Sequence, residues 1–233
     1  MISVQRAEER YAAKQDWLSS NFSFSFGPYI DPDNTRFGPM RVLNDDFIAP
    51  NRGFGAHPHS DMEVVSIVLK GWLKHQDNLG HVAVTTFGEI QRMSAGTGIV
   101  HTESNASETE ELNLLQMWFE PMQRGLPPTY EVSAFDVNQL DGRLLKVVSH
   151  QPAANVAKIH QDVTIYLSRL QAGEAIPFEG NPHRKVFLFV VEGALRVNET
   201  TVLQTRDAAR MEGESGLTLA ADEASFFMLI DLP

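Results

Sequence analysis

Two short stretches, each with two potential metal ligands at positions i and i+2, constrain this 233-residue chain more than any other feature. The first carries His57 and His59, and the second carries His101 and Glu103. Side chains two residues apart in an extended strand point to the same face, about 6.6 Å apart along the chain. If the two strands are neighbours inside a barrel, these four side chains converge on one point. Three imidazoles and one carboxylate suit a first-row divalent metal such as iron, manganese, nickel, copper or zinc.

Glycines precede both pairs of candidate ligands. Gly53 and Gly55 lie before the first pair, and Gly96 and Gly98 lie before the second. Glycine lets the backbone turn tightly where a Cβ would intrude on a bound ion. A single His-x-His pair is weak support for a site, because such pairs are common in surface loops. The second pair and the apolar segments between the two strengthen the prediction.

The rest of the chain favours an all-β fold. Short apolar segments are separated by turn signals such as Lys70-Gly71 and Asp77-Asn78-Leu79-Gly80, at a spacing of about ten residues. His75 and His81 flank the second of these turns, and we expect them to face solvent. His160 lies in a polar stretch that we expect to have no role at the metal.

Phenylalanines alternate with serines near the N-terminus. Phe22, Phe24 and Phe26 have the spacing of a half-buried strand. We expect all three to pack inside a barrel rather than to form a platform for a substrate.

An internal repeat indicates two similar barrels in tandem. Residues 68–74 match residues 190–196 at an offset of 122, each as strand, charged residue, glycine and strand. The same offset carries the ligand positions onto different residue types: His57 onto Glu179, His59 onto Asn181, and Glu63 onto Lys185. We therefore predict an N-terminal barrel at 1–130 with one metal, and a C-terminal barrel at 131–233 without ligands.

Composition excludes several classes of function. The net charge is -11, so the electrostatic attraction that drives binding to nucleic-acid phosphates is absent. The chain has no cysteine, no apolar leader at its start and no apolar run of about 18 residues. These features predict a cytoplasmic location, no membrane span and no direct nucleic-acid partner.

The motifs resemble those of the cupin superfamily and, more narrowly, the pirin family. In cupin terms, His57, His59, Glu63 and Gly71 make a first motif, and Gly98, His101 and Asn105 make a second. Several further stretches fit the pirin pattern: Trp17-Leu18, Phe22 to Gly27, Arg41 to Asp46, His57-Pro58-His59, Met93 to Gly98, and Asp231-Leu232-Pro233. The resemblance is strong over the first half and looser from about Asn138 onward.

This resemblance implies a bicupin with two antiparallel barrels and one divalent metal, usually Fe(II). The matching ligands are His57, His59, His101 and Glu103, so Glu63 would support the fold or contact a ligand instead. It also implies quercetin 2,3-dioxygenase activity on a flavonol and dioxygen, with Glu103 as the general base.

Relatives of this kind also act as metal-dependent regulators that bind protein partners, and the sequence leaves this alternative open. The metal would then be a redox sensor. An open cavity beside it, lined by Phe54, Met62 and Met93, would favour an enzyme, whereas a sealed metal would favour a binding module. A monomer is expected in either case.

Overall fold

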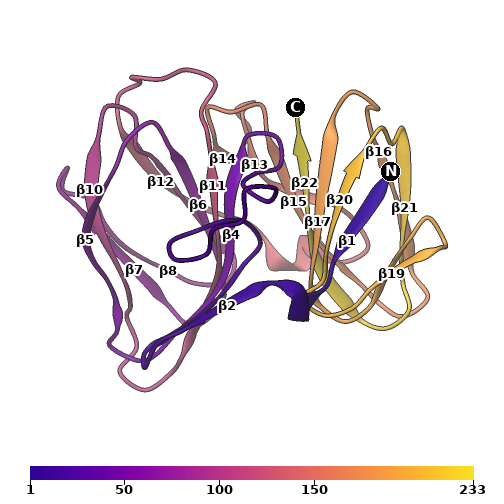
Figure 1. Cartoon of the computed structure of the whole chain (residues 1–233), viewed down its shortest axis with the longest axis horizontal. Helices are drawn as coiled ribbons and strands as arrows, with labels where there is room; N and C mark the ends of the chain where they lie inside the picture. The colour runs from indigo at the N-terminus through magenta and orange to yellow at the C-terminus, as the bar shows by residue number, and fades with distance from the viewer. The chain divides into compact units, whose positions relative to one another are not determined.

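The computed structural model describes residues 1–233, which fold as antiparallel β-sheets with two short 3-10 helices, η1 (Ala7–Glu9) and η2 (Val137–Leu140) (Figure 1). The chain divides into two compact units. The N-terminal unit comprises Tyr11–Phe135 and His150–Gln161, and the C-terminal unit comprises Met1–Arg10, Asp136–Ser149 and Asp162–Pro233. The predicted all-β fold with two barrels is confirmed.

Neither unit is continuous in sequence, unlike the simple division expected at residue 130. The first strand, β1 (Ile2–Gln5), belongs to the C-terminal unit because it pairs with β20 (Ala208–Glu212). Figure 1 shows this indigo strand beside the yellow and orange strands of that unit. Pairing between distant segments leaves no local signal in either segment, so no pattern in the sequence predicted it.

Two sheets form the N-terminal unit. The larger has the order β12-β9-β6-β11-β4-β3-β2, and the smaller has the order β5-β10-β7-β8. Their bounds are β2 Tyr11–Lys14, β3 Leu18–Phe22, β4 Met40–Ile48, β5 Gly53–His59, β6 Glu63–Lys70, β7 Leu73–Asp77, β8 Val82–Thr85, β9 Glu89–Ser94, β10 Ile99–Asn105, β11 Leu112–Phe119 and β12 Thr129–Ala134. The short β14 (Ala157–Lys158) also falls in this unit.

An apolar core joins the two sheets of the N-terminal unit. Leu73 of β7, in the smaller sheet, packs with Ile48, Val68 and Leu114 of the larger sheet. Because side chains alternate along a strand, Leu18, Ser20 and Phe22 of β3 point to the inside. The interior of this unit is therefore not uniformly apolar, since polar side chains from several strands also point inward.

The C-terminal unit repeats this arrangement. Its larger sheet runs in the order β1-β20-β17-β22-β15-β13, and its smaller sheet in the order β16-β21-β18-β19. The bounds are β13 Leu145–Ser149, β15 Thr164–Leu170, β16 Ala175–Glu179, β17 Lys185–Glu192, β18 Leu195–Val197, β19 Thr201–Leu203, β20 Ala208–Glu212, β21 Gly216–Ala221 and β22 Ser225–Leu232. Aliphatic side chains such as Leu188, Leu195 and Leu229 fill its core.

The internal repeat corresponds to real strands. Strand β17 begins and ends 122 residues after β6, and β16 begins 122 residues after β5. At the positions that match ligands, Glu179 ends β16 and Lys185 forms an ion pair with Glu212. None of the helices has the length and apolar character needed to cross a bilayer.

Candidate metal centre

Strands β5 and β10 bring the two ligand pairs together. They pair antiparallel, with His101 opposite His57 and Ile99 opposite His59. The register shifts between His101 and Glu103, which marks a β-bulge. At Gly53 the backbones approach so closely that a Cβ would lie 2.2 Å from the carbonyl oxygen of Glu103. Glycine at this position is therefore a requirement of the pairing that builds the site.

Three histidine rings form a compact cluster. Ring centroids lie 4.4 Å apart for His57 and His101, and 4.9 Å apart for both His57–His59 and His59–His101. One ring nitrogen from each lies within 4.8 Å of the other two. The spacing argument from the sequence therefore placed these three residues together correctly.

Burial keeps two of these rings neutral. It lowers the pKa of His59 to about 4, with the neighbouring His57 adding to the effect. Burial, with His57, His59 and His75, lowers the pKa of His101 to about 3. A metal binds the neutral imidazole, so both rings are in the ligating form at neutral pH without having to release a proton.

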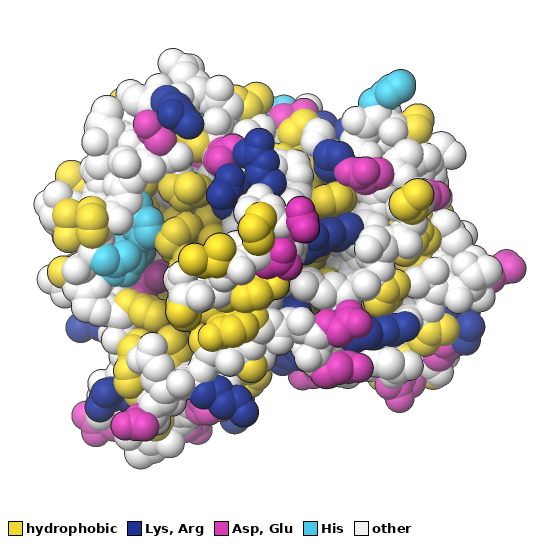
Figure 2. Space-filling view, in the orientation of Figure 1, with side chains coloured by type: hydrophobic (Ala, Val, Ile, Leu, Met, Phe, Trp, Pro, Cys, Tyr) yellow, Lys and Arg dark blue, Asp and Glu magenta, His cyan; other side chains and the backbone are white.

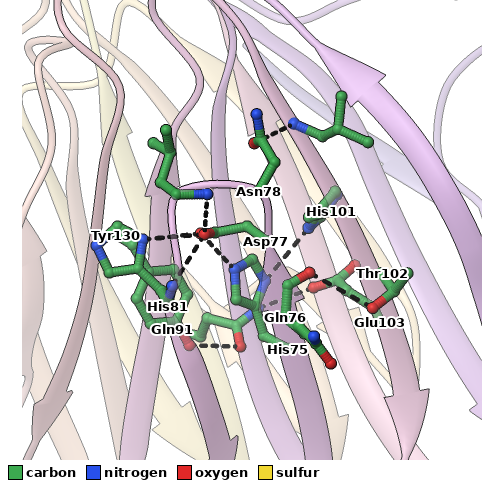
Figure 3. A network of polar contacts seen from close by, with 12 residues as sticks. His75, Gln76, Asp77, Asn78, His81, Gln91, His101, Thr102, Glu103 and Tyr130 are labelled. Carbon is green, nitrogen blue, oxygen red and sulfur yellow. Dashed lines mark hydrogen bonds and ion pairs between the residues drawn. The ribbon is translucent and has the colours of Figure 1, made fainter.

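His101 has a free nitrogen at the cluster. Its Nε2 is buried and has no hydrogen-bond partner, whereas its Nδ1 lies 3.3 Å from Nδ1 of His75 (Figure 3). A neutral imidazole carries one proton, and that proton is best placed where an acceptor exists. The proton therefore sits on Nδ1, and the lone pair of Nε2 is left for a metal.

Asp77 fixes the orientation of His75. Burial acts to raise the pKa of Asp77, but hydrogen bonds from His75 and from the side chain and backbone of His81 outweigh it and lower this pKa to about 2. The ionised carboxylate only accepts, so Nε2 of His75, 3.0 Å from Asp77 Oδ2, donates to it. Nδ1 of His75 is then placed to accept a hydrogen bond from His101.

The prediction that His75 and His81 face solvent was wrong for His75. Its side chain is fully buried, and it stacks on Tyr130 with 4.2 Å between ring centroids. His81 is partly exposed, and its Nδ1 lies 2.9 Å from Asp77 Oδ2. The alternation of β7, which buries Leu73, His75 and Asp77, explains the difference.

Glu103 belongs to a second group of potential metal ligands. Its carboxylate, with ring nitrogens of His75 and His101, forms another set of candidate ligands within 4.8 Å. Both of its oxygens also accept hydrogen bonds, from Gln91 Nε2 at 2.8 Å and from Gln116 Nε2 at 2.7 Å. Glu103 therefore lies next to His101, a member of the histidine cluster, and two side-chain amides fix the orientation of its carboxylate.

The orientation of these two amides is itself fixed. The indole N–H of Trp118 donates to Gln116 Oε1 at 3.0 Å, and the hydroxyl of Tyr130 donates to Gln91 Oε1 at 3.1 Å. Because an indole can only donate, the NH₂ of Gln116 must point the other way, toward Glu103. The carboxylate thus receives donors on both oxygens.

A cavity of about 400 Å³ opens beside the cluster. Its lining consists of Trp17, Leu18, Ser20, Phe22, Phe26, Asn44, Asp46, Gly53, Phe54, Gly55, His57, Glu103, Gln116 and Trp118. Figure 2 shows histidine side chains next to a yellow hydrophobic hollow, on the side where β5 and β10 lie in Figure 1. The volume is in the range of small-molecule sites.

The expected lining was correct for Phe54 and wrong for two methionines. Met62 and Met93 pack instead with a small cluster around Val64. Phe22 and Phe24 are buried, as expected for packing in the barrel, and Phe22 and Phe26 also line the cavity. That none of the three forms a platform for a substrate stays a prediction.

Glu63 lies apart from the histidine cluster. It is buried on β6, where it accepts hydrogen bonds from Ser94 Oγ at 2.6 Å and from the backbone N–H of His160 at 2.6 Å. The ring of His160 lies 3.0 Å from the same carboxylate. Glu63 thus ties residues 150–161 to the N-terminal unit, a role that the sequence did not assign to His160.

Sequence reasoning missed the polar residues that surround the cluster. Gln91 is a buried residue of β9, Gln116 is a buried residue of the largely apolar β11, and Asp46 ends an Asn-Asp-Asp run within β4. A polar residue at an inward position of a strand is the signal that identifies them. The spacing of histidines and acids along the strands does not carry that signal.

The double barrel with a histidine cluster inside one unit defines a bicupin with a candidate metal centre. The family model described as Pirin matches residues 4–119, and the one described as Quercetinase C-terminal cupin domain matches residues 146–232. Together the two models cover most of the chain. The chain belongs to the pirin family.

Named relatives resemble the chain along its whole length. A protein of Escherichia coli (strain K12) named quercetin 2,3-dioxygenase is 40% identical over 233 residues, covering 100% of this chain and 99% of the relative. A pirin-like protein of Caulobacter vibrioides is 36% identical over 232 residues, covering 99% of each.

Solved structures are equally similar. The crystal structure of YhhW from Escherichia coli has a TM-score of 0.95 at 39% identity, covering 100% of this chain and 98% of that one. Bacterial pirin YhhW in complex with nickel(II) has a TM-score of 0.94 at 39% identity, covering 100% and 99%. A divalent metal in this fold is thus supported by a relative and by the free nitrogen of His101 here.

Proposed function

We propose that this protein is a metal-dependent dioxygenase that cleaves flavonols such as quercetin. The observation that carries the proposal is the open cavity, whose lining includes both His57 of the cluster and the oriented carboxylate of Glu103. A binding module with a sealed metal would not need such an opening. The name of the 40% identical relative supports the same activity.

The walls of the cavity suit a planar aromatic substrate. Trp17, Phe22, Phe26, Phe54 and Trp118 all contribute to its lining. Trp17 and Phe54 meet edge to face with 5.3 Å between ring centroids, and Phe26 meets Trp118 in the same way at 5.2 Å. Aromatic rings stack and pack edge to face favourably, so a flat polyphenol gains contacts on both sides.

We assign His57, His59, His101 and Glu103 as the residues that hold the metal, and Fe(II) as the native ion. The neutral rings of His59 and His101 suit this role, and the set of three imidazoles and one carboxylate suits iron or nickel. When bound, such a metal lowers the pKa of a hydroxyl group near it and allows dioxygen to react.

The residues of this chain would then handle the proton. A flavonol hydroxyl in the cavity faces the carboxylate of Glu103, and that carboxylate takes the hydroxyl proton as a general base. The amides of Gln91 and Gln116 hold Glu103 in place through one lone pair on each oxygen, which leaves other lone pairs free. The aromatic walls exclude water from the reacting ring.

Oxygen consumption with quercetin tests the proposal. The full chain, purified without oxygen and loaded with Fe(II), should consume oxygen as the absorbance of quercetin falls. A His183→Ala variant, changed at an exposed histidine of the C-terminal unit, is the matched control and should behave like the wild type. Fully metallated protein that leaves the absorbance of quercetin unchanged would refute the proposal and favour a partner-binding regulator instead.

A further inference from the structure

One wall of the cavity is polar, in contrast to its aromatic surroundings. Ser20 of β3 and Asn44 and Asp46 of β4 all line the cavity. The three side chains are buried, with exposed fractions of 1%, 4% and 3%. They belong to the larger sheet, whereas His57 and Glu103 belong to the smaller sheet of the same unit. The cavity therefore has polar groups from both sheets, and those of β3 and β4 are not among the candidate metal ligands.

Asn44 has an unused hydrogen-bonding group. Its Oδ1 is buried and has no hydrogen-bond partner. Buried polar atoms in native proteins are almost always hydrogen-bonded, so an exception on the wall of a cavity indicates a partner that binds there. A hydroxyl group suits this position, because it both donates and accepts and so satisfies either end of an amide.

Asp46 adds a second polar group beside Asn44 on the same face of β4. Its Oδ1 accepts a hydrogen bond from the Ser20 hydroxyl, directly across the pairing of β3 with β4. Burial, with the nearby Asp45 and Glu103, raises the pKa of Asp46 to about 7. A carboxyl group offers a ligand hydroxyl an acceptor oxygen in either protonation state.

We propose that Asn44 and Asp46 form a subsite that recognises a second hydroxyl group of the aromatic substrate, other than the hydroxyl that faces Glu103. This inference rests on the proposed function and narrows its substrate class to polyhydroxylated flat aromatic compounds. An analogue without that hydroxyl leaves the two buried groups unpaired, and sites that bind a hydroxyl in this way discriminate strongly against such analogues.

Anaerobic binding measurements separate this subsite from the metal centre. Quercetin and 3-hydroxyflavone both carry the hydroxyl expected at the metal, but 3-hydroxyflavone lacks the other ring hydroxyls. Their Kd values are measured by calorimetry on the full, metal-loaded chain without oxygen, for the wild type, Asn44→Ala and Asp46→Ala. Asn21→Ala serves as the matched control, because Asn21 lies on β3 next to Ser20 but does not line the cavity.

We expect the wild type and Asn21→Ala to bind quercetin at least about 10-fold more tightly than 3-hydroxyflavone, which is the scale of one net hydrogen bond. Asn44→Ala should bring this ratio close to 1 while the Kd for 3-hydroxyflavone stays within about threefold of its wild-type value. Asp46→Ala, which removes the carboxyl group, should also reduce the ratio and provides the test if Asn44→Ala fails to fold.

A ratio that stays at its wild-type value in both variants would overturn the subsite. So would a wild type that does not distinguish the two flavonols. Oxygen uptake by the same preparations keeps the two proposals apart. Selective binding without oxygen uptake would refute the dioxygenase but retain the subsite, whereas oxygen uptake with unselective binding would do the reverse.

Discussion

Replacing Asp46 by asparagine should stabilise the metal-free protein above neutral pH. Burial raises the pKa of Asp46 from 3.8 to about 7, so the folded state holds a proton that the unfolded state has released. Between about pH 4 and pH 7 the folded state therefore binds more protons than the unfolded state. The free energy of unfolding contributed by this group consequently falls as the pH rises through that window, and it stays low above pH 7.

The magnitude follows from the size of the shift. A raised pKa of about three units corresponds to about 4 kcal/mol at 1.36 kcal/mol per unit, which is an upper bound because a folded protein relaxes around a buried charge. The amide introduced by Asp46→Asn carries no charge, yet its oxygen can still accept the hydrogen bond from Ser20. The advantage of Asp46→Asn should grow from near zero at pH 4 to between about 1 and 4 kcal/mol at pH 8.

Urea denaturation of the metal-free wild type and variant, at several values between pH 4 and pH 8, gives this difference directly. Other titrating groups are common to both proteins and cancel in the comparison. Asp33→Asn makes the same chemical change at an exposed carboxylate and is the control. A difference for Asp46→Asn that is flat with pH, or a variant less stable than the wild type at pH 8, would show that the reasoning about this buried carboxyl is wrong.

The remaining predictions concern the metal. His101→Ala should weaken the binding of Ni²⁺ more than about 100-fold in calorimetry. Substitutions of residues that only hydrogen-bond to a metal ligand typically weaken binding about 10–100-fold. Tight Ni²⁺ binding by His101→Ala would exclude His101 as a ligand. Asp77→Asn should weaken Ni²⁺ binding about 10–100-fold because it frees the His75 ring, and equal affinities would refute that orienting role. Glu63→Gln should lower the metal content less than Glu103→Gln does. The reverse order would show that Glu63, rather than Glu103, is the carboxylate ligand of the metal. Per bound iron, Glu103→Gln should lose about 10²–10⁴-fold in rate, and an unchanged rate would exclude it as the base.

The spacing of ligands along strands predicted the core of the site. Alternation in an extended strand requires His57 and His59 to share a face, and the pairing of β5 with β10 then places His101 opposite His57. The repeat at an offset of 122 located β17 from β6 in the same way. Both are local patterns repeated in a second segment, which is the kind of information that one sequence carries.

Features that depend on which strands become neighbours were not predicted. His75 lies next to His101 only because β7 pairs with the edge of β10 that is opposite to β5. The spacing of residues within β7 does not reveal this pairing. Oδ1 of Asn44 has no hydrogen-bond partner only because the cavity opens beside this side chain. The charged form of Asp46 is unfavourable because the side chain is buried. Such costs concentrate where function requires them, which agrees with a role for this wall in binding a substrate.

The metal content of the protein tests the central claim most directly. Elemental analysis of the full chain, purified without oxygen, should find one divalent transition metal per chain in the wild type and little in His57→Ala. The C-terminal unit has Glu179, Asn181 and Lys185 at the matching positions, so we expect no contribution from it. Two metals per chain, or a full complement of metal in His57→Ala, would contradict the account.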